Sequence, residues 1–171
     1  MKIIDVNVLK FHAVSNTVRD SEFHVHPGPQ HDTVEKVLVI KCDDGTEGIA
    51  FGPMDERVIL STVKEILIGE DPFFRERIWR RLVQLQRLRR NLTEDTLCAV
   101  DVAIWDICGK KLNLPVSKIL GQYRETIPAY ASIMVGDDIP GGLDTPEAYA
   151  SFAASLVNQG YKAIKLHTWM P

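Results

Sequence analysis

The sequence predicts an α+β fold, in which a small antiparallel sheet and several helices precede a parallel βαβ unit. Three features of the 171 residues lead to this prediction. Residues 34–51 alternate around a turn, residues 55–113 carry apolar side chains at helical spacing, and residues 126–168 follow a strand, helix, strand pattern. A strand–helix–strand unit of this length implies a pair of parallel strands.

Composition is typical of a globular protein and excludes several classes. Hydrophobic residues make up 45% of the chain and charged residues 25%. The net charge of −3 is too close to neutral for a nucleic-acid-binding protein or for one held by charge on a membrane. No stretch reaches the ~20 apolar residues of a membrane span, and the N-terminus does not resemble a signal peptide. The three cysteines lack metal-ligand spacing, and such sparse usage favours a cytoplasmic protein.

The first strands are predicted from alternation and turn chemistry. Residues 3–10 alternate apolar and polar side chains, which indicates a strand with one buried face. Residues 34–42 form a second predicted strand, and residues 47–51 return antiparallel after a turn at Gly45. The sheet is therefore expected to have about three strands.

Residues 12–33 between these strands contain four of the five histidines. Two prolines and a glycine interrupt this segment, so we predict an irregular polar loop there. A metal site at His24 and His26 is the alternative. No nearby set of carboxylates and histidines completes such a site, and we assign no metal ligand in this chain.

Three helices follow, each predicted from its boundary residues or from apolar side chains at helical spacing. The predicted caps are Asp55, Asp71 and either Asn91 or Thr93, and the predicted ends of the first and third helices are Gly69 and Asn113. One face of the second helix carries seven arginines, which we interpret as a solvated face with local ion pairs. Cys98 and Cys108 lie within the apolar pattern of the third helix, where we expect them to pack in the core.

The βαβ unit ends in a strand with two unusual side chains. A strand at Thr126–Met134 and a helix capped by Thr145 come before it. Lys165 and His167 point the same way because strand side chains alternate between faces. Buried polar groups are costly unless they serve a function, but a strand that ends early would let both reach water. Spacing alone leaves both interpretations open.

Four segments in order resemble the enolase superfamily, in particular its mandelate racemase / muconate lactonizing enzyme branch. Residues 99–110 resemble the last helix of that branch's capping domain, residues 114–121 the turn after it, residues 127–132 the first barrel strand, and residues 160–165 the approach to the second. The resemblance implies an N-terminal α+β capping domain, a three-stranded antiparallel sheet plus helices, at residues 1–125. It also implies the first βαβ of a TIM-like barrel at residues 126–171, with the barrel incomplete in this chain.

The resemblance also implies site residues. Lys165 matches the first lysine of the family's Lys-x-Lys motif and is expected to stabilise negative charge. His167 departs from the motif by replacing its second lysine, and an imidazole can act as an acid or base there. The expected substrate-binding residues are Ser132 at the end of the first barrel strand and, in a lid of two loops that sets specificity, His24, His26, Gln30 and His31 of one loop and Met54 of the Gly52–Glu56 loop.

The implied activity is Mg²⁺-dependent abstraction of the proton α to a carboxylate, and we expect an acid-sugar dehydratase. Alternatives are a racemase, epimerase or cycloisomerase of the same branch, or a binding or assembly module without catalysis. The family's metal ligands lie on later barrel strands, and a TIM barrel needs ~250 residues. We therefore interpret the chain as the N-terminal part of a longer enzyme, inactive alone, with a naturally short form as the alternative. The expected partners are a small carboxylate substrate and further copies of the protein.

Overall fold

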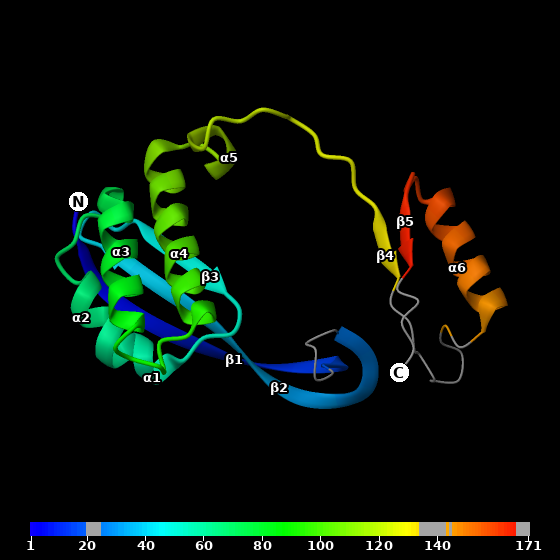
Figure 1. Ribbon diagram of the computed structural model, residues 1–171, viewed down its shortest axis with the longest axis horizontal. Helices are drawn as coiled ribbons and strands as arrows, with labels where there is room; N and C mark the ends of the chain where they lie inside the picture. The colour runs from blue at the N-terminus through cyan, green and yellow to red at the C-terminus, as the bar shows by residue number, and fades with distance from the viewer. Residues whose placement is uncertain (20–24, 134–142, 144, 167–171) are drawn as a thin grey trace. The chain divides into compact units, whose positions relative to one another are not determined.

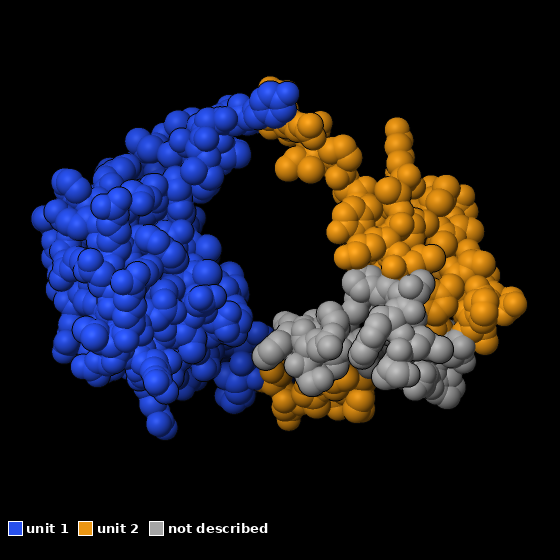
Figure 2. Space-filling view, viewed as in Figure 1, with its two compact units in different colours: residues 1–13, 34–123 blue, residues 14–33, 124–171 orange. Residues whose placement is uncertain are grey.

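The computed structural model describes the backbone of residues 1–19, 25–133, 143 and 145–166, and the side chains of these except residues 19 and 25–27. The chain forms two compact units (Figures 1 and 2). The first contains Met1–Ala13 and Val34–Tyr123, and the second contains Val14–Thr33 and Arg124–Pro171. Each unit is described separately below.

Three strands form the N-terminal sheet in the order β1-β2-β3. Their bounds are Ile3–Arg19 for β1, Val25–Cys42 for β2 and Glu47–Phe51 for β3. β2 and β3 are antiparallel, and Val39 lies opposite Ile49. The turn between them is closed by the Cys42 amide, which donates to the Thr46 carbonyl over 2.9 Å. The predicted three-stranded antiparallel sheet is confirmed.

The predicted irregular loop at residues 12–33 is wrong for residues 12–19 and 25–33, because β1 and β2 continue through them as strands. A strand pair supplies the backbone partners that an irregular segment would have to find in water. β3 pairs only with residues 37–41 of β2. The prolines near the start of β2, which have no amide proton to donate, therefore lie outside the stretch that pairs with β3. Gly28 also permits close pairing, since a Cβ there would come within 2.6 Å of Cγ1 of Val18.

Helical segments cover residues 56–119. Their bounds are Glu56–Val58 for α1, Ile59–Val63 for the π-helical η1, Lys64–Leu67 for α2, Pro72–Phe74 for the 3₁₀-helical η2, Arg75–Gln86 for α3, Glu94–Leu112 for α4 and Val116–Ile119 for α5. The predicted caps are confirmed. Asp55 accepts from two amides of α1, Asp71 accepts from the Phe73 amide, and Thr93 accepts from the Thr96 amide. α4 ends at Asn113 in the left-handed conformation, as its sequence predicts.

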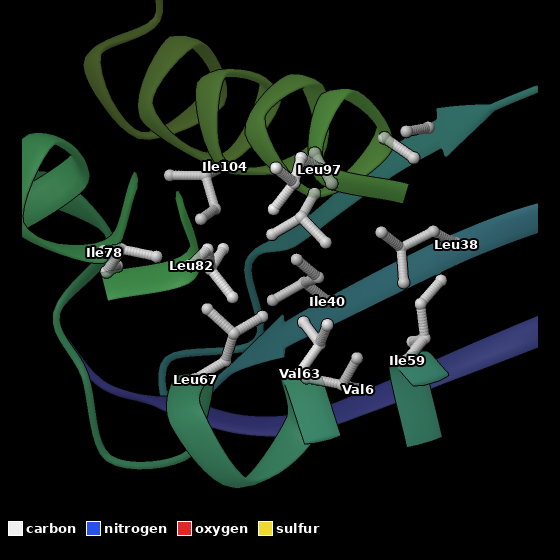
Figure 3. Packing of buried hydrophobic residues seen from close by; sticks show 14 of the residues in the cluster. Val6, Leu38, Ile40, Ile59, Val63, Leu67, Ile78, Leu82, Leu97 and Ile104 are labelled. Atoms are coloured by element: carbon white, nitrogen blue, oxygen red, sulfur yellow. The ribbon is translucent and has the colours of Figure 1, made fainter. Parts of the chain in front are cut away.

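The core of the first unit lies between the sheet and the helices (Figure 3). Buried side chains come from the sheet, from the α1–α2 segment, from α3 and from α4; those labelled in the figure are Val6, Leu38, Ile40, Ile59, Val63, Leu67, Ile78, Leu82, Leu97 and Ile104. α4 packs directly on β3. A Cβ on Gly48 of β3 would lie 2.0 Å from the carbonyl oxygen of Ala103, so only glycine permits this backbone approach.

Side chains of α4 also cover the outer edge of β3. The amide of Ile49 donates to a carboxylate oxygen of Asp106 over 2.9 Å. The ammonium of Lys110 donates to the carbonyl of Glu47 over 2.8 Å and to Asp106 over 2.7 Å. Among the residues that the structure describes, no fourth strand lies at this edge, so these bonds satisfy its backbone groups.

The arginines of α3 make local contacts, as the sequence predicts. Arg77 and Arg81 both pair with Glu70, and the Arg75 guanidinium lies 3.7 Å from the ring centroid of Trp105. Burial alone would raise the pKa of Glu70, but the two guanidinium groups outweigh it and lower that pKa below its ordinary value. The α3 face is therefore involved in structural ion pairs.

The second unit contains the predicted βαβ segment. Its elements are β4 at Ala131–Ile133, α6 at Pro146–Asn158 and β5 at Ile164–Leu166. β4 and β5 are parallel, and the Thr145 hydroxyl caps α6 by accepting from the Ala148 amide. The first strand is shorter than predicted, since residues 126–130 are not assigned to a strand. β5 pairs with residues 131–133 only, so residues 126–130 have no partner in this strand pair. An extended segment that lacks such a hydrogen-bonded partner is not a strand.

No helix in the described part of the chain is both long enough and apolar enough to cross a membrane.

Candidate functional site

The β4–β5 pair brings two predicted site residues together. Ser132 and Lys165 are register partners in the parallel ladder, and both are exposed. Partners in register project to the same face of a sheet because side chains alternate along each strand. Ile133, the next residue of β4, is buried. A hydroxyl and an ammonium group thus share one face, and both can donate hydrogen bonds to a carboxylate.

Two of the predicted lid residues, Gln30 and His31, lie on β2. Gln30 and His31 are exposed on β2, and Nδ1 of His31 lies 3.0 Å from the carbonyl oxygen of Pro29. His24 lies outside the described residues, as does the side chain of His26. The substrate-binding role assigned to these four residues stays a prediction.

His167 also lies outside the described residues. Its predicted acid or base role therefore stays a prediction, and so does the charge-stabilising role of Lys165.

The Gly52–Glu56 loop lines a hollow of about 530 Å³ in the first unit. Residues 53–57 form one side of it, and Lys36, Thr93 and Asp95 complete the lining. Met54 is only 7% exposed and packs in the hydrophobic core. Its carbonyl oxygen accepts a hydrogen bond from Nζ of Lys36 over 3.2 Å. Substrate contact by Met54 stays a prediction; within this loop Pro53 is exposed, and Asp55 and Glu56 are half-buried.

The two buried cysteines, Cys42 and Cys108, are poor nucleophiles. All three cysteines are free, and burial raises the pKa of Cys42 to about 11 and also raises the pKa of Cys108. A thiol that stays protonated at neutral pH is a poor nucleophile. Cys108 packs in the core as predicted, whereas Cys98 is exposed, contrary to prediction. Cys98 follows the buried Leu97, and one residue turns a helix by ~100°, away from the core.

The described residues include no group of three or more His, Cys, Asp or Glu side chains that could hold a metal ion.

Sequence patterns did not reveal which residues fix the Gly52–Glu56 loop. Lys36 of β2 and Thr96 of α4 both bond to its backbone, 18 and 41 residues away in sequence. A threonine three residues after the cap Thr93 indicates only a helix start. Nothing local to Thr96 identifies the loop as its partner.

Residues 13–121 match the sequence model described as "Mandelate racemase / muconate lactonizing enzyme, N-terminal domain". The matched range covers β2, β3 and helical segments α1 to α5, together with residues 13–19 at the end of β1. It ends before β4.

Three relatives illustrate the range of named activities. The chain is 35% identical over 137 residues to D-galactarolactone cycloisomerase of Agrobacterium fabrum, covering 76% of this chain and 35% of that protein. It is 32% identical over 142 residues to a D-galactonate dehydratase family member of Pseudarthrobacter chlorophenolicus, covering 78% of this chain and 33% of that protein. A crystal structure of D-glucarate dehydratase from Agrobacterium tumefaciens, complexed with magnesium, superposes with a TM-score of 0.91 at 46% identity.

That superposition covers the whole of this chain and 46% of the dehydratase. The chain spans about a third of the length of the two curated relatives. The similarity thus extends through β4, α6 and β5, and the sheet-plus-helices unit followed by a parallel strand pair is a capping domain with the start of a barrel.

Proposed function

The chain belongs to the mandelate racemase / muconate lactonizing enzyme family, and from this premise we propose that it is the N-terminal part of an acid-sugar dehydratase. Such an enzyme removes the proton α to the substrate carboxylate, after which the β-hydroxyl leaves. The observation that carries the proposal is the shared face of Ser132 and Lys165 on neighbouring parallel strands. The names of two relatives, a D-galactonate dehydratase family member and D-glucarate dehydratase, support the substrate class.

In this proposal Ser132 and Lys165 act on the substrate carboxylate. The hydroxyl of Ser132 donates a hydrogen bond to one carboxylate oxygen and fixes its orientation. The ammonium of Lys165 stabilises the negative charge that develops when the α-proton is removed. His167 supplies the acid or base, because an imidazole titrates near neutral pH. His24, His26, Gln30, His31 and Met54 contact the rest of the substrate.

The proposal includes Mg²⁺ as a cofactor, bound by ligands outside the described residues. The magnesium of the D-glucarate dehydratase structure supports this part. The proposal also places the complete protein in the cytoplasm as a homo-oligomer. Light scattering coupled to gel filtration tests the oligomer.

The test uses the complete protein, Mg²⁺ and a panel of acid sugars that includes glucarate, galactarate and galactonate. Dehydration is measured by mass spectrometry as the loss of one water from the substrate. We expect Lys165→Met and His167→Asn to lower kcat by roughly 10²–10⁴-fold, the usual effect of losing one positioned acid, base or charge. Lys162→Met, which removes an exposed lysine just before β5, is the matched control.

Failure of every acid in the panel to react would contradict the dehydratase proposal. Wild-type turnover in His167→Asn, with wild-type exchange of the α-proton for solvent deuterium, would show that His167 is structural.

A cycloisomerase is the second candidate, favoured by the 35% identity to D-galactarolactone cycloisomerase. Cycloisomerisation rearranges the substrate without changing its mass, as do racemisation and epimerisation. Separate incubations of the complete protein with an aldaric acid and with its lactone therefore distinguish the candidates. A product lighter than the open-chain acid by one water supports the dehydratase, whereas no reaction of the acid, together with conversion of the lactone to a product of unchanged mass and new NMR spectrum, supports the cycloisomerase.

A further inference from the structure

The Gly52–Glu56 loop is held at two consecutive residues by side chains that come from different elements. Nζ of Lys36, on β2, donates to the carbonyl of Met54 over 3.2 Å. The amide of Asp55 donates to Oγ1 of Thr96, on α4, over 3.0 Å. Both bonds connect positions distant in sequence, so they fix the loop relative to the sheet and to α4 rather than to itself.

The buried position of Thr96 indicates that its hydrogen bond matters. The residue is 0% exposed, and a buried hydroxyl without a partner is costly. Its oxygen lies 3.2 Å from Oγ1 of Thr93 and accepts from the Asp55 amide. Valine has nearly the same shape but no hydroxyl, so packing alone does not explain a threonine here. The hydrogen bond to the loop does.

The loop in turn sets the start of α1. A carboxylate oxygen of Asp55 accepts from the amides of Arg57 and Val58 over 2.9 and 3.2 Å. Asp55 is thus fixed through its amide by α4 and through its carboxylate by α1. The hollow of about 530 Å³ opens on this same backbone, with Lys36 and Thr93 among its lining residues.

We propose that Thr96 and Lys36 are positioning residues that hold the Gly52–Glu56 loop in one conformation, and that this conformation sets the enzyme's preference among acid sugars. The role in substrate preference rests on the proposed function, whereas the positioning of the loop concerns this chain alone. Both side chains act through the shape of the hollow and not by contact with the reacting atoms.

The first test measures the loop directly. Amide hydrogen exchange of residues 54–58 is followed by NMR in the wild type and in Thr96→Val, Thr96→Ser and Lys36→Met. We expect the Asp55 amide to exchange roughly tenfold faster in Thr96→Val, because the hydrogen bond that protects it is removed. Thr96→Ser keeps the hydroxyl and should restore slow exchange. Lys36→Met should speed exchange at residues 54–58 by roughly threefold to tenfold.

Two variants serve as controls. Thr62→Val removes a threonine hydroxyl on η1 that lies 3.4 Å from Oγ of Ser61, a neighbour within η1 rather than a loop residue. Lys41→Met removes a lysine of β2 that pairs with Glu47 instead. Exchange at residues 54–58 should be unchanged in both. Unchanged exchange in Thr96→Val and Lys36→Met, or equal acceleration in the controls, overturns the positioning role.

The second test uses the complete enzyme and its best acid sugar. We expect Thr96→Val and Lys36→Met to raise KM roughly tenfold while kcat stays within about twofold of the wild-type value. We also expect the KM values of the different acid sugars in the panel to differ less from one another than in the wild type. Thr96→Ser should retain wild-type values. A loop that exchanges faster while KM and its spread stay unchanged overturns the specificity role.

These readouts keep the two proposals separate. If the complete protein turns over no acid sugar, the proposed function fails, and the exchange experiment still decides whether Thr96 and Lys36 fix the loop. If Thr96→Val does not fold, Lys36→Met decides, because Lys36 is only half-buried and its loss leaves the core intact.

Discussion

Helices α4 and α6 begin in the same way but differ in what they bury. Each starts with a threonine whose hydroxyl accepts an amide hydrogen bond three residues on, from Thr96 in α4 and from Ala148 in α6. α4 has nine buried residues, whereas α6 has none within the described chain. Phe152 and Val157 of α6 are 42% and 57% exposed. Local signals therefore suffice to place a helix, but the stability of a helix comes mainly from the surface it buries.

The largest expected difference between the two helices is in amide exchange. In the 171-residue chain, α4 amides should exchange at least about 1,000-fold more slowly than α6 amides, because opening α4 requires unfolding of a core worth at least about 5 kcal/mol. Exchange followed by NMR measures both helices in one sample. Equal protection would show that further chains or copies cover α6.

A matched pair of leucine substitutions should give the next largest difference. Leu97→Ala removes a side chain that is 2% exposed in α4 and should lower the free energy of unfolding by about 2–5 kcal/mol. Leu156→Ala in α6 removes a partly exposed leucine and should cost less than about 1 kcal/mol. Urea denaturation of the chain measures both. A cost above about 2 kcal/mol for Leu156→Ala would mean that α6 belongs to a packed core.

Loss of either cap should cost about 1 kcal/mol, but the two losses should appear in different measurements. Thr93→Ala should lower the urea midpoint of the first unit, because α4 is part of its core. Thr145→Ala should leave that midpoint unchanged and reduce the helical Cα chemical shifts of α6. The controls Thr93→Ser and Thr145→Ser retain a hydroxyl and should behave as wild type. A lower urea midpoint in Thr145→Ala would show that the two units unfold together.

The smallest effect is an acid-dependent loss of stability in the first unit. The pKa of Glu70 is lowered in the folded state from its ordinary value of 4.5, so its ion pairs with Arg77 and Arg81 stabilise fully above that pH. Their contribution is lost as the pH falls through the lower folded pKa. Glu70→Gln should therefore destabilise by about 0.5–1 kcal/mol at pH 7 and by less at pH 3. An equal loss at both pH values, measured by urea denaturation, would contradict this role.

Helix caps, which depend on nearby residues, were predicted correctly. The caps Asp55, Thr93 and Thr145 bond to amides two or three residues ahead, and the sequence shows both partners at once. Residues 12–19 of β1 and 25–33 of β2 were wrongly predicted to form a loop. Each of these strand segments is stabilised by the other, and neither has a strong strand pattern alone.

The candidate site shows the same limit. Ser132 and Lys165 were named through family resemblance, and their pairing depends on the register of two strands 33 residues apart. Lys36 and Thr96 were not named, since their bonds to Met54 and Asp55 cross the fold. Periodicity reports which face of an element is buried, but it does not report which distant backbone group a buried hydroxyl will meet.

The outer edge of β3 has a consequence for aggregation. An exposed strand edge lets a strand of another molecule add to the sheet, which is a common first step toward fibrils. Here the Ile49 amide is already bonded to Asp106, and the Glu47 carbonyl to Lys110. Because Asp106 and Lys110 are one turn apart on α4, a single helix blocks two successive docking points of an incoming strand. An incoming strand therefore meets backbone groups at this edge that are already bonded within the chain.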